Sequence, residues 1–322
     1  MRIKEFLMLI KCFYVNIKSS KSLPKFIGED VLDINNAENL KINFTDQVDF
    51  PKIIWMYWED RQPPQYVQDI VRHTQFLNKN FEVILLHRDN IKDYLHDFSI
   101  KGEMPIANMT DLLRLKLLYE YGGIWIDATT IFNEDLNWVI KIAEKKNYDI
   151  IGYYKDKSTI DIKYPIIESW FLAAKPNNQM IKKWLDELSP LGDLGSELYF
   201  EKIKSRLDYN EIKQKIGRPE YLLVYLAQQI VMRENKGFNF YLKRSEDSAF
   251  LIQESMGWSN YEINYALCRL SVTEPLIPII KLTSGDRILI NEFINYNLVN
   301  ETSVIGSIIN KKRTKNIEYE LV

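Results

Sequence analysis

Apolar residues recur along this chain at two spacings, one typical of helices and one typical of strands. Between residues 111 and 121, leucines and tyrosines return every three or four positions, which predicts a helix. Two glycines follow at residues 122–123, and a glycine just past a helix lets the chain turn sharply because it has no Cβ. Residues 124–132 are aromatic and β-branched, which favours a strand. One face of that strand would carry Trp125, Asp127 and Thr129.

The segments around this helix–turn–strand unit predict an α/β fold. Strands are expected within residues 52–58 and at 81–86, with a helix at 66–76 between them. This order implies a right-handed crossover and a parallel pair of strands, the beginning of a nucleotide-binding sheet. Further strands are expected at 149–154 and 169–174, and helices at 89–97, 136–146, 180–188 and 221–233.

The N-terminal stretch predicts an amphipathic helix over residues 1–17. Apolar residues lie at helical spacing and basic residues stand among them, but no run reaches the ~18 to 20 apolar residues that span a bilayer. The helix either packs on the domain or lies on an anionic membrane surface. The apolar positions are Ile3, Phe6, Leu7, Ile10, Phe13, Tyr14 and Ile17, and the basic ones Arg2, Lys4, Lys11 and Lys18.

Composition excludes several classes of function. The 42 basic and 44 acidic residues give a net charge of −2, so no broad nucleic-acid-binding surface is expected. The two cysteines, Cys12 and Cys268, are too few for a disulfide framework and are expected to be inert thiols in a reducing compartment. None of the three histidines stands in a zinc-hydrolase motif, and no G-x-S-x-G motif of an α/β-hydrolase accompanies them.

Asp111 and Arg114 lie three positions apart on the predicted helix, so their side chains project in one direction. A sugar nucleotide needs carboxylates for sugar hydroxyls or a metal, and a cation for the diphosphate. The alternative is a surface salt bridge on an amphipathic helix that leads into a core strand. Asp111 is expected in the first helical turn, where the helix dipole favours a carboxylate whatever its function.

The same stretch resembles the signature of DXD-containing sugar transferases. These families include capsular polysaccharide synthesis proteins, the initiating mannosyltransferases of fungi and glucosylating bacterial toxins. Their pattern D-x-x-R-x-x-x-L-x-x-x-G-G-x-x-x-D is met by Asp111, Arg114, Leu118, Gly122, Gly123 and Asp127. The sequence departs from it where Thr129 replaces the second carboxylate of D-x-D.

The resemblance implies a glycosyltransferase A-type domain over residues 51–290. An added helical lobe around 178–240 would shape the acceptor pocket, with a connector up to residue 50 and a C-terminal tail over 291–322. On the first strand, Ile54 and Trp55 match an I-W motif near the nucleotide base, although a buried core tryptophan is an equal alternative. The strand at 169–174 also resembles these families and implies that Glu168 and Trp170 approach the acceptor.

The resemblance also implies a donor and a metal. The donor would be a UDP- or GDP-sugar bound by Ile54, Trp55, Asp111, Arg114, Gly123, Asp127 and Thr129. A Mn²⁺ or Mg²⁺ ion would be held by Asp127 and Thr129. Residues 275–287 resemble a K-L-T-H segment in which Ser284 takes the histidine position, so Ser284 or Asp286 would complete the metal site. Lys281 would neutralise the departing diphosphate together with Arg114.

The expected function is hexose transfer to a glycan or lipid-linked oligosaccharide in bacterial capsular or surface polysaccharide synthesis, with retention of configuration. The expected location is the cytoplasm or the inner face of the cell membrane, where residues 1–17 would make contact. Two alternatives remain: a toxin-like enzyme that glycosylates a protein, and a sugar-nucleotide binder without catalysis, which Thr129 and Ser284 make plausible.

Overall fold

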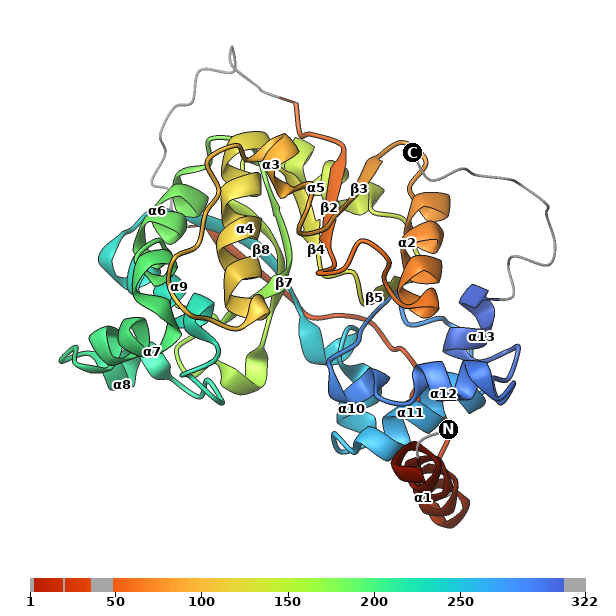
Figure 1. Cartoon of the computed structure of the whole chain (residues 1–322). Helices are drawn as coiled ribbons and strands as arrows, with labels where there is room; N and C mark the ends of the chain where they lie inside the picture. The colour runs from red at the N-terminus through yellow and green to blue at the C-terminus, as the bar shows by residue number, and fades with distance from the viewer. Residues whose placement is uncertain (1–2, 20, 36–48, 310–322) are drawn as a thin grey trace.

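The computed structural model of the chain describes residues 3–19, 21–35 and 49–309. Its centre is a seven-stranded mixed sheet in the order β1-β8-β6-β7-β4-β2-β3 (Figure 1). Three neighbouring pairs are parallel, namely β2 with β3, β2 with β4, and β6 with β8. The strands are β1 (Val31–Asn35), β2 (Ile53–Tyr57), β3 (Glu82–Leu86), β4 (Gly123–Ile126), β6 (Ile150–Tyr154), β7 (Ile167–Ala174) and β8 (Asn239–Arg244).

Helices cover both faces of this sheet, which explains why β2 and β4 are almost entirely apolar. Successive side chains of a strand point to opposite faces, so Ile54 and Met56 enter one hydrophobic core while Trp55 and Tyr57 enter another. The first core includes residues of α2 (Gln65–Leu77) and α5 (Asn137–Lys145). The second includes residues of α4 (Ile106–Tyr121), α6 (Gln179–Leu188), α7 (Leu191–Lys204), α8 (Tyr209–Lys213) and α9 (Leu223–Glu234). The short α3 (Ile91–Tyr94) follows β3.

The C-terminal part forms a second layer of helices beside the first core (Figure 1). It is attached to the main sheet by a two-stranded sheet of β5 (Thr130–Phe132) and β9 (Ile279–Lys281). N-terminal α1 packs against α11 of this layer through Leu9 and Cys12, so one face of the helix packs on the domain. The helices are α1 (Ile3–Ser19), α10 (Leu251–Ser255), α11 (Asn260–Arg269), α12 (Ile290–Asn295) and α13 (Val304–Ile309).

The predicted α/β fold with a parallel β2–α2–β3 unit and an added helical lobe is confirmed. The strand expected at 124–132 is instead two strands, because the Thr130 amide donates to the Asp127 carbonyl at 3.0 Å and turns the chain. The helix expected from residue 111 begins at Ile106, so Asp111 lies beyond its first turn.

Two expected boundaries also differ. The N-terminal connector contains β1, which pairs antiparallel with β8. The expected tail over 291–322 contains α12 and α13, where Val304 and Ile305 are buried. Arg2 and residues 36–48 and 310–322 lie outside the described residues. None of the helices described is long and apolar enough to cross a bilayer.

Candidate active site

Asp127 follows the last residue of β4, at the edge of the sheet where the parallel strands β2 and β4 end. In open α/β sheets, ligands bind at this carboxyl edge, where loops rather than paired backbone meet solvent. The Asp127 amide donates to the Trp170 carbonyl on β7 at 3.0 Å, which fixes the start of the turn. The Asp127 side chain retains 29% of its exposure and is therefore reachable.

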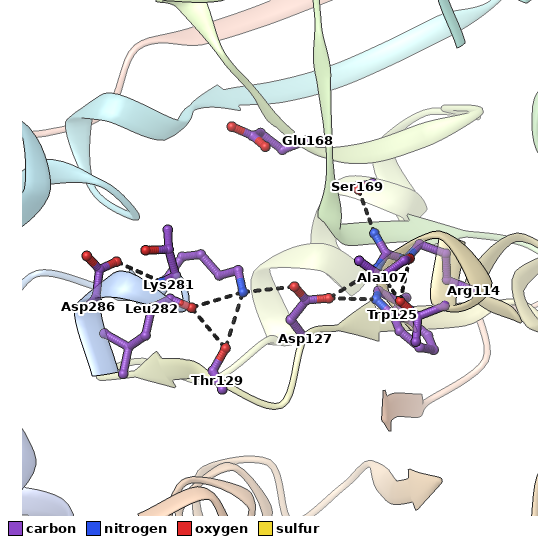
Figure 2. A network of polar contacts seen from close by, with 12 residues as sticks. Ala107, Arg114, Trp125, Asp127, Thr129, Glu168, Ser169, Lys281, Leu282 and Asp286 are labelled. Carbon is purple, nitrogen blue, oxygen red and sulfur yellow. Dashed lines mark hydrogen bonds and ion pairs between the residues drawn. The ribbon is translucent and has the colours of Figure 1, made fainter. Parts of the chain in front are cut away.

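Two cations hold the Asp127 carboxylate from opposite sides (Figure 2). Lys281 Nζ lies 2.8 Å from Oδ2, and Arg114 Nη2 lies 3.4 Å from Oδ1. Trp125 Nε1 also donates to Oδ1 at 3.2 Å. Lys281 is the last residue of β9, and its pairing with Thr130 of β5 places it beside the end of β4. Residues far apart in the chain thus meet at one carboxylate.

Arg114 connects Asp127 to the second carboxylate, Asp111. Its Nη1 lies 3.0 Å from Asp111 Oδ1 and donates to Ser169 Oγ at 2.5 Å. The guanidinium also lies over the Trp125 ring, 5.1 Å from the centroid. Both Asp111 and Arg114 are buried, so the alternative of a surface salt bridge is wrong for this pair. Two carboxylates and two cations form one contiguous network.

The two carboxyl groups have pKa values shifted in opposite directions. Burial raises the pKa of Asp111 to about 6, although Arg114 opposes the shift. Burial also acts to raise the pKa of Asp127, but the charges of Lys281 and Arg114 outweigh it and leave that pKa below its usual range. Asp127 therefore stays ionised at neutral pH, whereas Asp111 takes up a proton just below neutral pH.

Thr129, Asp286 and Ser284 contribute to the turns around the site. Thr129 Oγ1 donates to the Leu282 carbonyl at 3.0 Å and thereby ties the turn after β4 to the end of β9. Asp286 is buried, and its Oδ2 accepts from Gln253 Nε2 at 2.9 Å and from the Thr283 amide at 2.7 Å. Ser284 is exposed at the start of the same turn.

These residues do not fit a divalent cation as they are arranged. Hard cations take several oxygen ligands. Here the Asp127 carboxylate faces the Lys281 ammonium, Thr129 Oγ1 donates to the Leu282 carbonyl, and Asp286 Oδ2 accepts from Gln253. Within residues 3–19, 21–35 and 49–309, no group of three or more His, Cys, Asp or Glu side chains is placed to hold a metal. Lys281 and Arg114 supply positive charge at this site.

Ile54, Trp55 and Gly123 lie away from this network. Trp55 is 1% exposed and packs against Tyr94, with its Nε1 donating to the Gly122 carbonyl at 2.9 Å, which matches a core tryptophan and leaves no open ring face for a base. Ile54 is fully buried. Gly123 opens β4 at the opposite end from Asp127, where a Cβ would meet the Ile53 carbonyl at 2.6 Å.

Trp58 is a further candidate residue that the sequence pattern did not single out. It directly follows β2 at the carboxyl edge, and Arg287 lies over its ring at 5.2 Å from the centroid. Trp58 is half-buried, in contrast to Trp55. Its position just past a strand end, where a ring can meet a ligand, is the signal that could have identified it.

Comparisons with known proteins show which family this chain resembles. Residues 10–210 match the family described as capsular polysaccharide synthesis protein. The O-glycosyltransferase braB of Annulohypoxylon truncatum is 29% identical over 203 residues, which cover 54% of this chain and 47% of that protein. The putative glycosyltransferase HOC1 of Saccharomyces cerevisiae is 22% identical over 161 residues, covering 45% of this chain and 41% of its own.

The chain thus spans less than half the length of these two curated relatives, both of which are fungal. Among solved structures, the PaToxG glycosyltransferase aligns with 72% of this chain and 89% of its own at a TM-score of 0.31 and 14% identity, which is too low to bear on the fold. The family match covers well over half of the chain and includes the Asp111, Arg114 and Asp127 network. The chain therefore belongs to the capsular polysaccharide synthesis protein family.

Proposed function

We propose that the chain is a glycosyltransferase that moves a hexose from a nucleotide-diphosphate sugar to a hydroxyl group of a glycan. The observation that carries this proposal is the network of Asp111, Arg114, Asp127 and Lys281 at the carboxyl edge of the sheet. Membership of the family supports it, as do relatives that are named glycosyltransferases. The name O-glycosyltransferase, given to braB, supports an oxygen acceptor.

In the proposed reaction, the acceptor oxygen forms a bond to the anomeric carbon and its proton passes to the departing diphosphate. The bond from the anomeric carbon to phosphate breaks, and its electron pair stays on the phosphate oxygen. Lys281 and Arg114 are placed to stabilise that negative charge. At a separation of about 4 Å and an effective dielectric near 20, one such charge pair contributes roughly 4 kcal/mol before desolvation.

The network is electrically balanced before a donor binds, since two carboxylates face two cations. Donor binding would therefore exchange partners: the Lys281 ammonium turns from Asp127 to the diphosphate, and Asp127 accepts hydrogen bonds from sugar hydroxyls. Burial lowers the local dielectric, so these charge–charge interactions are stronger here than at the protein surface. Retention of configuration and a capsular or surface glycan as product belong to the same proposal.

A donor panel tests this function. The protein is incubated with UDP- and GDP-sugars, with and without Mn²⁺, and released nucleotide diphosphate is measured. We expect turnover with at least one donor and its loss in Asp127→Ala, with an unchanged circular dichroism spectrum. Binding without turnover of any donor would instead indicate a non-catalytic sugar-nucleotide binder. Comparing a lipid-linked glycan with a purified host protein as acceptor distinguishes a polysaccharide enzyme from a toxin-like one.

We further propose that α1 contacts an anionic membrane, as suits a lipid-linked acceptor. The face of α1 opposite Leu9 and Cys12 exposes an apolar stripe, and Lys11 beside it is exposed. Apolar side chains enter the headgroup region while lysines attract anionic lipids. The exposed fractions are 45% for Phe6, 58% for Leu7, 49% for Ile10, 57% for Tyr14 and 75% for Ile17.

Vesicle sedimentation tests this contact. We expect the protein to sediment with phosphatidylglycerol-containing vesicles and less with pure phosphatidylcholine, and Leu7→Ser with Ile17→Ser to abolish the difference. Phe76→Ser, at a 59% exposed position on α2, is the matched control. Equal sedimentation of all three proteins would contradict a role for α1.

A further inference from the structure

Trp258 and Phe250 form an aromatic surface that ring contacts and hydrogen bonds connect to Trp170 and Lys281. Trp258 is 40% exposed, and its ring centroid lies 5.4 Å from that of Phe250. Lys155 Nζ stands 5.3 Å from the Trp258 centroid and 5.4 Å from the Phe250 centroid. Trp258 has a φ of +58° and follows Gly257 at +59°, a conformation that is rare for a bulky residue. The backbone thus holds the Trp258 indole at the surface in a conformation that is energetically unfavourable.

This aromatic surface is joined to the strand that carries Lys281. The Lys281 amide donates to the Ala249 carbonyl at 2.9 Å, and Gln253 Nε2 donates to the Lys281 carbonyl at 2.7 Å. On its other side, the Phe250 ring meets Trp170 at a centroid distance of 6.0 Å. Trp170 is the residue whose carbonyl fixes Asp127. Backbone and ring contacts therefore link Phe250 to both ends of the Asp127–Lys281 ion pair.

Glu168 supplies an unused polar group beside this surface. It is 2% exposed, and its Oε2 accepts from the Tyr225 hydroxyl at 2.5 Å. Its Oε1 has no hydrogen-bond partner, although it is buried. A buried acceptor without a partner is unfavourable, and a ligand hydroxyl that donates to Oε1 would satisfy it.

The Glu168 side chain lies on the Lys281 side of the network, where the charges of Lys155 and Lys281 act on it. Figure 2 shows its side chain directed toward the side of Lys281, whereas the neighbouring Ser169 turns toward Arg114. Burial raises the pKa of Glu168, and the positive charge of Lys155 opposes this shift. The Glu168 carboxyl group therefore interacts electrostatically with Lys155, the lysine that lies over Trp258.

We infer that Trp258, Lys155 and Glu168 form the acceptor subsite, and that the acceptor is a carbohydrate whose pyranose ring stacks on the Trp258 indole while a hydroxyl donates to Glu168 Oε1. This inference rests on the proposed function. An aromatic wall with a few polar groups is how proteins bind such ligands, since the ring face is apolar and the hydroxyls need directed partners.

The subsite is tested by comparing donor hydrolysis with sugar transfer in the same protein. Hydrolysis uses water in place of the acceptor, so only transfer depends on the acceptor subsite. The acceptor panel contains methyl α- and β-glycosides of glucose, galactose and mannose and, as another class, a serine-containing peptide. Trp258→Ala and Glu168→Gln are compared with Phe76→Ala, an exposed aromatic on α2. Glu168→Gln keeps an oxygen for the Tyr225 hydroxyl, so packing is preserved.

We expect both subsite variants to lower kcat/KM for the glycoside acceptor by about tenfold or more and to leave donor hydrolysis within about twofold. Unchanged transfer, an equal loss of hydrolysis and transfer, or transfer to the peptide alone would overturn the inference. Saturation-transfer NMR with the same glycosides gives a reading without turnover: signals that are present in the wild type should vanish in Trp258→Ala. An absence of hydrolysis with every donor would overturn the proposed function separately.

Discussion

Lys281→Met removes one of the two cations at Asp127 while keeping most of the side-chain volume. In the structure, Lys281 Nζ lies 2.8 Å from Asp127 Oδ2, and at an effective dielectric of 20 that separation corresponds to about 6 kcal/mol before desolvation. Removing one preorganised donor from a transition-state charge typically costs about 2.7–4 kcal/mol. We therefore expect kcat for donor hydrolysis to fall about 100- to 1000-fold.

The assay is release of nucleotide diphosphate with the best donor of the panel, measured with and without EDTA. Because the residues around Asp127 do not fit a divalent cation, we expect EDTA to change the rate by less than about threefold, far less than the loss of one stabilising charge. Lys182→Met is the matched control, since Lys182 forms an exposed ion pair with Asp186 at 2.7 Å. It should leave the rate unchanged, because exposed pairs contribute about 0–1 kcal/mol.

The same variant also has a stability readout. Loss of a charged hydrogen bond costs about 1.5–3 kcal/mol, so Tm should fall by several degrees while the protein still folds. The reasoning would be refuted if Lys281→Met retained near wild-type turnover while EDTA abolished activity and Mn²⁺ restored it. That outcome would assign the positive charge to a metal at Asp127 and leave Lys281 as a residue that only occupies the space.

Three further predictions concern this network and the strand β4 that leads to it. As pH falls through about 6, Asp111 takes up a proton and its ion pair with Arg114 is lost, so kcat/KM should fall. The pH–rate profile of Asp111→Asn should lack this acidic limb, whereas that of Glu168→Gln should keep it. Gly123→Ala should lower the free energy of unfolding in urea by about 3 kcal/mol, since φ is +92° and a Cβ would meet a β2 carbonyl at 2.6 Å. Gly217→Ala, where nothing lies within 4 Å, should change it by less than about 0.5 kcal/mol. Arg114→Lys should cost about 2–3 kcal/mol in thermal melts, because one ammonium cannot replace a planar guanidinium that contacts two carboxylates and a serine; an unchanged melting curve would contradict that geometry.

Local sequence patterns determined the elements that carry half of the site. The spacing of Asp111 and Arg114 places both on one side of a helix, and the glycine pair sends the chain directly into β4. Asp127 then lies at the carboxyl end of a strand, because an apolar run ends in a polar residue there. These features depend on neighbours within a few positions, so the sequence is sufficient to predict them.

Tertiary structure alone decided the rest. The pairing of β5 with β9 brings Lys281 to Asp127. Gln253 of α10 then connects β9 to Trp258, because it donates to the Lys281 carbonyl and accepts from the Trp258 amide. Trp55 and Trp58 look alike in the sequence, yet one is enclosed by the core and the other stands at the strand end. Sequence spacing fixes which side chains share a face, but only the packing of distant segments decides which face is covered and which charges meet.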